Sequence, residues 1–253
     1  MKRIFFFALA LPLTCGTGPA QLQNLNGAGG APGSDFAVLS KLFGKATAFS
    51  ARSEVRVLDK DQKETIRVVM DFARLDKNIR MEIDLAKMKN QDLPPGTLDG
   101  LQQMGLDKFV TLIRPDRKTL QVIYPKVASY LTLPMKPEDL EAAEKSSLKT
   151  ELLGRETLDG HACVKNKISI TPPNGGPQTF TVWNATDLKD FPIQTQTRQD
   201  ADTIITRYTN VQLLRPDAKQ FEPPAGFEEF KGLEAFQAGM LKKSLGGGTP
   251  PAK

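Results

Sequence analysis

Hydrophobic and polar residues alternate along most of this chain. Ile79, Met81 and Ile83, for example, alternate with Arg80 and Glu82. A period of two is typical of a β-strand that has one face in the core and the other in water. We therefore interpret the charged members of these runs as the exposed outer face of a sheet.

Short polar segments separate the alternating runs. Residues 59–62 (DKDQ) and 75–78 (LDKN) have the composition of hairpin loops, and Pro115 suits the turn position where φ must be fixed. Other turn sequences lie at 159–160, 172–177, 187–192 and 199–202. The runs between the turns predict eleven strands, at 47–58, 63–74, 78–88, 108–115, 118–125, 128–134, 148–157, 161–171, 178–186, 192–199 and 203–214.

Four segments have helical spacing instead. In the first, one helical face holds Phe36, Leu39, Leu42 and Phe43, and Ser34 is a suitable N-cap in front of it. The other three helices are predicted at 97–106, 137–146 and 232–245. Consecutive antiparallel strands with few helices predict a mainly β (α+β) fold, a strongly curved antiparallel sheet of about eleven strands.

The dry face of such a sheet must be covered, and the short helices are its natural cover. If the cover is incomplete, it leaves a cavity suited to an apolar ligand. Because side chains alternate along a strand, eight residues form the expected apolar wall: Val55, Val57, Val68, Met70, Phe72, Met81, Ile83 and Leu85. Methionines such as Met70 and Met81 suit a pocket for flexible chains; alternatively, they fill gaps in the core.

The first twenty residues have the pattern of an export signal. Lys2 and Arg3 precede a ten-residue apolar run at 4–13, and small residues lead to Ala20. We predict cleavage after Ala20 and a periplasmic location. Alternatively, Cys15 is lipidated and the protein is a membrane-anchored lipoprotein, since the segment behind it has the composition of a flexible tether.

The remaining chain is interpreted as one domain. Residues 21–34 form a flexible leader, 35–245 a β domain, and 246–253 (GGGTPPAK) a disordered tail. Charged residues make up 25% of the chain and no apolar run approaches the roughly 18 residues of a membrane-spanning helix. Without Lys2 and Arg3, 32 basic residues face 29 acidic ones, a balance without a basic stripe for nucleic acid.

Candidate chemistry is sparse. His161 is the only histidine, and Cys163 follows on the same face of its strand. The two could share a metal or form a nucleophilic pair; the simpler interpretation is a residue after a turn and a small buried hydrophobe. No phosphate loop, nucleophile elbow or zinc-protease helix is present, so we predict no enzyme, no cofactor and no metal site.

Short motifs along the chain resemble an uncharacterised bacterial exported family within the LolA/LolB-like group, the outer-membrane lipoprotein carriers. The motifs span roughly 35–230 and occur at 80–82 (RME), 110–116 (VTLIRPD), 124–125 (YP), 130–134 (YLTLP), 154–163 (GRETLDGHAC), 180–183 (FTVW), 191–193 (FPI) and 221–227 (FEPPAGF). The resemblance implies an unclosed half-barrel with helices as a lid over a hydrophobic cavity, and a ligand consisting of lipoprotein acyl chains.

The sequence thus predicts an exported cell-envelope protein that binds a lipid, or the acyl chains of a lipoprotein, without catalysis. The alternative is an envelope scaffold that uses the sheet edge or the C-terminal helix to bind a protein partner and has no lipid ligand. In either case we expect at most peripheral contact with a membrane.

Overall fold

The computed structural model describes residues 38, 40–90, 93–173 and 175–245. The predicted signal peptide, Cys15, the leader and the tail lie outside these residues. The thirteen described strands form a single sheet: β1 (Ala48–Leu58), β2 (Glu64–Leu75), β3 (Asn78–Asp84), β4 (Lys89–Asn90), β5 (Lys108–Arg114), β6 (Thr119–Tyr124), β7 (Ser129–Pro134), β8 (Ser147–Leu158), β9 (His161–Thr171), β10 (Gln178–Ala185), β11 (Phe191–Gln199), β12 (Asp202–Gln212) and β13 (Glu228–Lys231).

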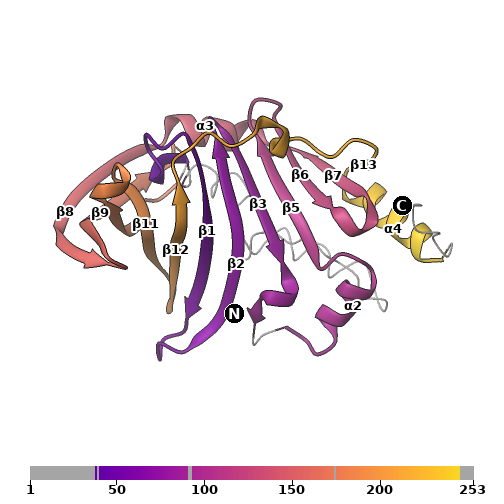
Figure 1. Ribbon diagram of the computed structural model, residues 1–253, viewed down its shortest axis with the longest axis horizontal. Helices are drawn as coiled ribbons and strands as arrows, with labels where there is room; N and C mark the ends of the chain where they lie inside the picture. Colours follow the sequence, from indigo (N-terminus) through magenta and orange to yellow (C-terminus); the bar gives the residue numbers. More distant parts are fainter. Residues whose placement is uncertain (1–37, 39, 91–92, 174, 246–253) are drawn as a thin grey trace.

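The sheet is strongly curved and does not close (Figure 1). Its strand order is β13-β7-β6-β5-β3-β2-β1-β12-β11-β10-β9-β8, so that β13 and β8 form its two edges. All eleven predicted strands are present, which confirms the mainly β fold class. The two additional strands are the two-residue β4, on β2, and β13, which pairs with β7 in parallel.

Turn chemistry fixes the hairpins as the sequence suggests. The Asp59 carboxylate accepts hydrogen bonds from the backbone N–H groups of Asp61 and Lys63, at 2.9 and 3.0 Å. At the end of β3 the strand predicted at 78–88 stops at Asp84, whose carboxylate accepts from the N–H of Ala86 and caps the 3₁₀ helix η2 (Leu85–Lys87). Leu85 therefore belongs to a helical turn.

The helices cover the concave face of the sheet. The α-helices with complete bounds are α2 (Thr97–Gln103), α3 (Pro137–Lys145) and α4 (Leu233–Leu245), and residues 40–42 are helical near the N-terminus. Leu101 of α2, Ala143 of α3 and Phe236 of α4 enter the main core. Further 3₁₀ turns are η3 (Pro125–Val127), η4 (Thr186–Leu188) and η5 (Ala218–Phe221).

The register places most of the expected wall residues on one face. Val55 lies opposite Val68, Met70 opposite Ile83 and Phe72 opposite Met81. Directly opposed residues of antiparallel strands point to the same side of the sheet. This face is the concave one, and it carries the main core.

The outer face is partly covered, which the sequence pattern did not predict. Residues 213–227 run from β12 along one rim of the sheet to β13 (Figure 1). Phe221 is buried against Ala73 and Leu75, and Phe227 packs on a cluster with Leu112. Leu112 lies opposite Arg80 of β3. The strand neighbours of Arg80 are Ile79 and Met81, which face the concave core, so Arg80 and Leu112 point to the outer face. Residues 213–227 therefore cover the outer face of β2, β5 and β6.

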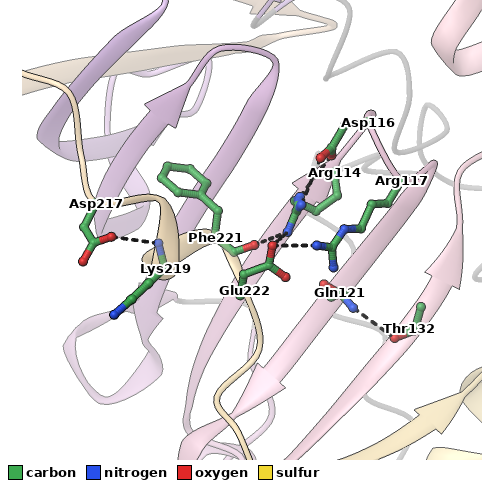
Figure 2. A network of polar contacts seen from close by, with 9 residues as sticks. All are labelled: Arg114, Asp116, Arg117, Gln121, Thr132, Asp217, Lys219, Phe221 and Glu222. Atoms are coloured by element: carbon green, nitrogen blue, oxygen red, sulfur yellow. Dashed lines mark hydrogen bonds and ion pairs between the residues drawn. The ribbon is translucent and has the colours of Figure 1, made fainter.

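A polar network holds this segment on the sheet (Figure 2). Arg114 is only 4% exposed; it donates to the backbone carbonyl of Phe221 and forms ion pairs with Asp116 and Glu222, at 2.9 and 3.0 Å. The hydrogen bond from Arg114 holds the pKa of Asp116 below its usual range, so the pair stays charged at neutral pH. Glu222 also pairs with Arg117 at 2.8 Å.

Candidate ligand-binding cavity

A cavity of about 720 Å³ lies on the concave face of β1, β10, β11 and β12. These strands occupy the left half of the molecule in Figure 1. Its volume falls within the roughly 300–1,000 Å³ typical of sites for small molecules. The lining residues are Val38, Leu42, Val55, Val57, Pro177, Gln178, Thr179, Phe180, Thr181, Thr195, Gln196, Thr197, Arg198, Gln199, Ile204, Thr206 and Tyr208.

Strand register arranges the floor of the cavity in two rows. In one row, Val57 lies opposite Ile204, Ile204 opposite Thr197, and Thr197 opposite Phe180. The other row runs from Val55 through Thr206 to Thr195, and Thr195 lies opposite Val182, which is fully buried and does not line the cavity. The two rows together combine aliphatic groups with threonine methyl and hydroxyl groups.

The floor also has a definite length along the strands. Its outer end is at Gln199 of β11, which lies opposite Asp202 of β12, and its inner end is at Tyr208 of β12. The length of the floor is therefore the distance along β12 from Asp202 to Tyr208. Six residues of an extended strand span about 20 Å. One leaflet of a bilayer core is about 15 Å thick, so the floor is long enough for a single acyl chain.

An aromatic cluster closes the inner end. The ring of Tyr208 lies 5.3 Å from that of Phe43 and 5.9 Å from that of Phe191, and Phe49 and Phe72 complete the group. Tyr208 is 6% exposed, and this burial raises the pKa of its hydroxyl, while the hydrogen bond with Ser53 lowers it slightly. The phenol is therefore neutral, and this end of the cavity carries no charge.

Val38 and Leu42 form the roof on the β9–β10 side. Both are buried against Ile168, Ile170 and Phe180. The helical segment predicted from Phe36 to Phe43 thus covers the half of the sheet that contains the cavity. The part of that segment before Val38, and Leu39, lie outside the described residues.

The eight residues predicted to form the wall lie close together on the concave side, and two of them line the cavity. Val55 and Val57 are lining residues. The other six pack in or against the main core beside it: Val68, Met70, Phe72, Met81, Ile83 and Leu85. Leu101 of α2 and Leu106, which follows α2, pack in the same core as these six residues. Most of the lining, on β10 to β12, was missed by sequence reasoning.

His161 and Cys163 do not form a shared site in the structure. The Nδ1 atom of His161 lies 2.7 Å from a carboxylate oxygen of Asp187, and this hydrogen bond lowers the pKa of Asp187. Cys163 is 3% exposed; its thiol donates to the carbonyl of His161, and burial raises its pKa. A protonated thiol is a poor nucleophile. No cluster of three His, Cys, Asp or Glu side chains suited to a metal ion occurs in the described part of the chain.

The outer strand β8 is a second unusual feature. It forms an edge of the sheet over twelve residues, and its large side chains are exposed: Leu148 by 44%, Leu152 by 65% and Leu153 by 47%. A bulge between Leu152 and Gly154 interrupts its pairing with β9. Within the described residues, no helix is both long and apolar enough to cross a membrane.

Comparisons with known proteins gave matches among solved structures. Neither a protein family nor a curated protein sequence matches the chain. Similar structures include the lipoprotein LppX of Mycobacterium tuberculosis, at 11% identity, covering 70% of this chain and 95% of LppX with a TM-score of 0.37. LprF of Mycobacterium bovis is 16% identical, covering 74% of this chain and 99% of LprF with a TM-score of 0.37.

A LolA superfamily protein of Nitrosomonas europaea is also similar. It is 12% identical to this chain, and the match covers 76% of this chain and 98% of that protein with a TM-score of 0.35.

Proposed function

We propose that this protein binds a lipid, or an acyl chain of a lipoprotein, in the cavity on the concave face and does not act on it chemically. The observation that carries the proposal is the floor: rows of aliphatic and threonine side chains cross β1, β12, β11 and β10, and the floor extends about 20 Å along the strands from the rim to Tyr208. A long, narrow apolar chain fits such a surface better than a compact polar molecule does.

The energetics favour the same ligand. Each methylene moved from water to an apolar surface contributes roughly 0.8 kcal/mol. Threonine hydroxyls at three positions of the floor, Thr195, Thr197 and Thr206, reduce this gain locally. Thr197 already donates its hydroxyl to the carbonyl of Thr179 at 2.8 Å, so that hydroxyl does not require a partner from the ligand.

The predicted signal peptide would bring such a protein to the cell envelope, where lipids and lipoproteins occur. The same proposal therefore includes a periplasmic location, with attachment through Cys15 as the alternative. Mass spectrometry of the exported protein distinguishes the two, because a mature chain that begins at Gln21 differs from one that begins at an acylated Cys15.

A pair of tryptophan variants on β12 tests the ligand site. Thr206→Trp places a large side chain on the floor between Val55 and Thr195. Ile205→Trp is the matched control, because Ile205 lies opposite Arg56 and Gln196 and points to the other face. We expect the wild type and Ile205→Trp to bind a fluorescent fatty-acid analogue at micromolar concentration, and Thr206→Trp to lose it.

Two results would contradict the proposal. The first is a wild-type protein that binds no fatty-acid analogue at micromolar concentration. The second is equal binding by the two tryptophan variants, both shown to be folded by circular dichroism. In the second case the ligand would occupy another part of the protein.

The exposed edge strand favours a second candidate function, binding of an extended segment of a partner protein. An unpaired edge offers backbone N–H and C=O groups to an added strand, and Leu148 and Leu152 offer apolar contacts beside it. A partner crosslinked to β8 of a protein that carries no lipid would favour this function. Leu152→Lys should then weaken that crosslink without changing fatty-acid binding.

A further inference from the structure

The open end of the floor is edged by polar side chains on the concave side. Gln199 of β11 lies opposite Asp202 of β12, and the two flank the turn of the β11–β12 hairpin. Each is two residues away from a member of the floor, Thr197 on β11 and Ile204 on β12. Residues two apart on a strand point to the same side, so Gln199 and Asp202 face the cavity side of the sheet.

Gln178 adds a second amide at the same end. It is the first residue of β10, two positions before Phe180, and it lies opposite Ile170, which is buried beside the roof. Gln178, Gln199 and Asp202 are half-buried, and none of the hydrogen bonds or ion pairs found in the described part of the chain involves their side chains. Two amides and one carboxylate are therefore available to a ligand at the open end.

The charged member of the cavity lining points away from this end of the floor. Arg198 lies between Thr197 and Gln199 on its strand and opposite Thr203 on the next, so its side chain is on the outer face. The other lining residues are aliphatic, aromatic, proline, threonine or glutamine. On the concave side the lining thus supplies no cation, and Asp202, beside it, supplies a negative charge.

We propose that the cavity prefers amphiphiles with an uncharged, hydroxyl-bearing head, such as the glycerol of an esterified acyl chain, over free fatty acids. This inference rests on the proposed function, because it assigns the head group of the ligand whose chain lies on the floor. The aromatic cluster around Tyr208 closes the inner end, so the head lies at the open end, between the amides of Gln178 and Gln199. Hydroxyl groups both donate hydrogen bonds to amides and accept them.

Charge favours the same head. A carboxylate or phosphate head would lie near Asp202 without a cation of the lining to neutralise it, and like charges repel. A hydroxyl group can instead donate a hydrogen bond to the Asp202 carboxylate, and hydrogen bonds to charged groups are stronger than those between neutral groups.

The test compares three ligands that share a palmitoyl chain: monopalmitoylglycerol, methyl palmitate and palmitate. Their binding is measured at neutral pH by displacement of a fluorescent probe. Gln199→Leu removes one amide from the open end, and Gln196→Leu is its matched control, because Gln196 lies opposite Ile205 and points to the outer face. We expect Gln199→Leu to reduce the advantage of monopalmitoylglycerol over methyl palmitate roughly three- to tenfold, and Gln196→Leu to leave it unchanged.

A second pair of variants tests the charge. Asp202→Asn removes the carboxylate, and Asp71→Asn is its matched control, since Asp71 lies opposite Arg52 on the outer face of β1 and β2. We expect Asp202→Asn to strengthen the binding of palmitate roughly two- to fivefold without changing that of methyl palmitate. Asp71→Asn should change neither.

The outcomes separate this inference from the proposed function. A preference for monopalmitoylglycerol that is lost in Gln199→Leu, together with tighter binding of palmitate by Asp202→Asn, supports the inference. A wild type that binds palmitate more tightly than both esters, or folded variants that behave like their controls, overturns it while lipid binding stands. Failure of all three ligands to bind overturns the proposed function and this inference together.

Discussion

The length of the bound chain should control affinity in a predictable way. The perturbation is in the ligand: saturated fatty acids are extended by two methylenes at a time. In one row of the floor, Val57, Ile204 and Phe180 are apolar and Thr197 is not; in the other, Val55 is apolar and Thr206 and Thr195 are not. A methylene on this mixed surface should contribute about 0.5–0.8 kcal/mol, the upper value applying where burial is complete and apolar.

Two methylenes then contribute about 1.0–1.6 kcal/mol, which lowers Kd roughly five- to fifteenfold. The increments should stop once the chain reaches the aromatic cluster around Tyr208, because the floor is only about 20 Å long. The assay is displacement of a fluorescent fatty-acid analogue by chains of ten to eighteen carbons. Affinities that change less than twofold over the whole series would refute an apolar chain on this floor.

Three further predictions concern single residues. Gly239→Ala should destabilise the protein by about 1–3 kcal/mol in urea denaturation, because the added methyl carbon would lie 2.2 Å from a ring atom of Phe230; a more stable variant would contradict this packing of α4. Cys163→Ala should cost about 1 kcal/mol of stability and leave fatty-acid binding intact, and a folded variant without binding would revive a role for the thiol. The hydrogen bond from Arg56 is the largest cause that lowers the pKa of Glu64 to about 2. A lowered pKa stabilises the fold above the ordinary value near 4.5 and loses that effect as pH falls toward 2, so Glu64→Gln should reduce stability by about 1 kcal/mol at pH 7 and by almost nothing at pH 2. A pH-independent effect in urea melts would contradict this.

The strands were predictable because their information is local. Alternation and turn residues such as Asp59 specify each hairpin, and the structure contains all eleven predicted strands. The segment over the outer face was not predictable in the same way. Residues 213–227 have no period, and what fixes them is tertiary: Phe221 finds a buried site and Arg114, distant in sequence, binds its carbonyl.

The location of the cavity was also outside the reach of pattern analysis. The predicted wall followed the alternating strands β1 to β3, and in the structure six of its eight residues pack in or against the main core. The open part lies on β10 to β12, where Thr195 and Thr206 face inward. Threonine occurs on both faces of a sheet, so its position in a sequence does not mark the concave side.

The central claim, that an apolar chain lies on the floor formed by β1 and β10 to β12, can be tested most directly by photocrosslinking. A fatty acid with a photoreactive group near its tail is bound, irradiated, and the modified peptides are identified by mass spectrometry. We predict labels near Tyr208, Val55 and Thr195, and their loss in Thr206→Trp. Labels confined to β5 to β7 or to the exposed strand β8, or equal labelling of Thr206→Trp, would contradict the account.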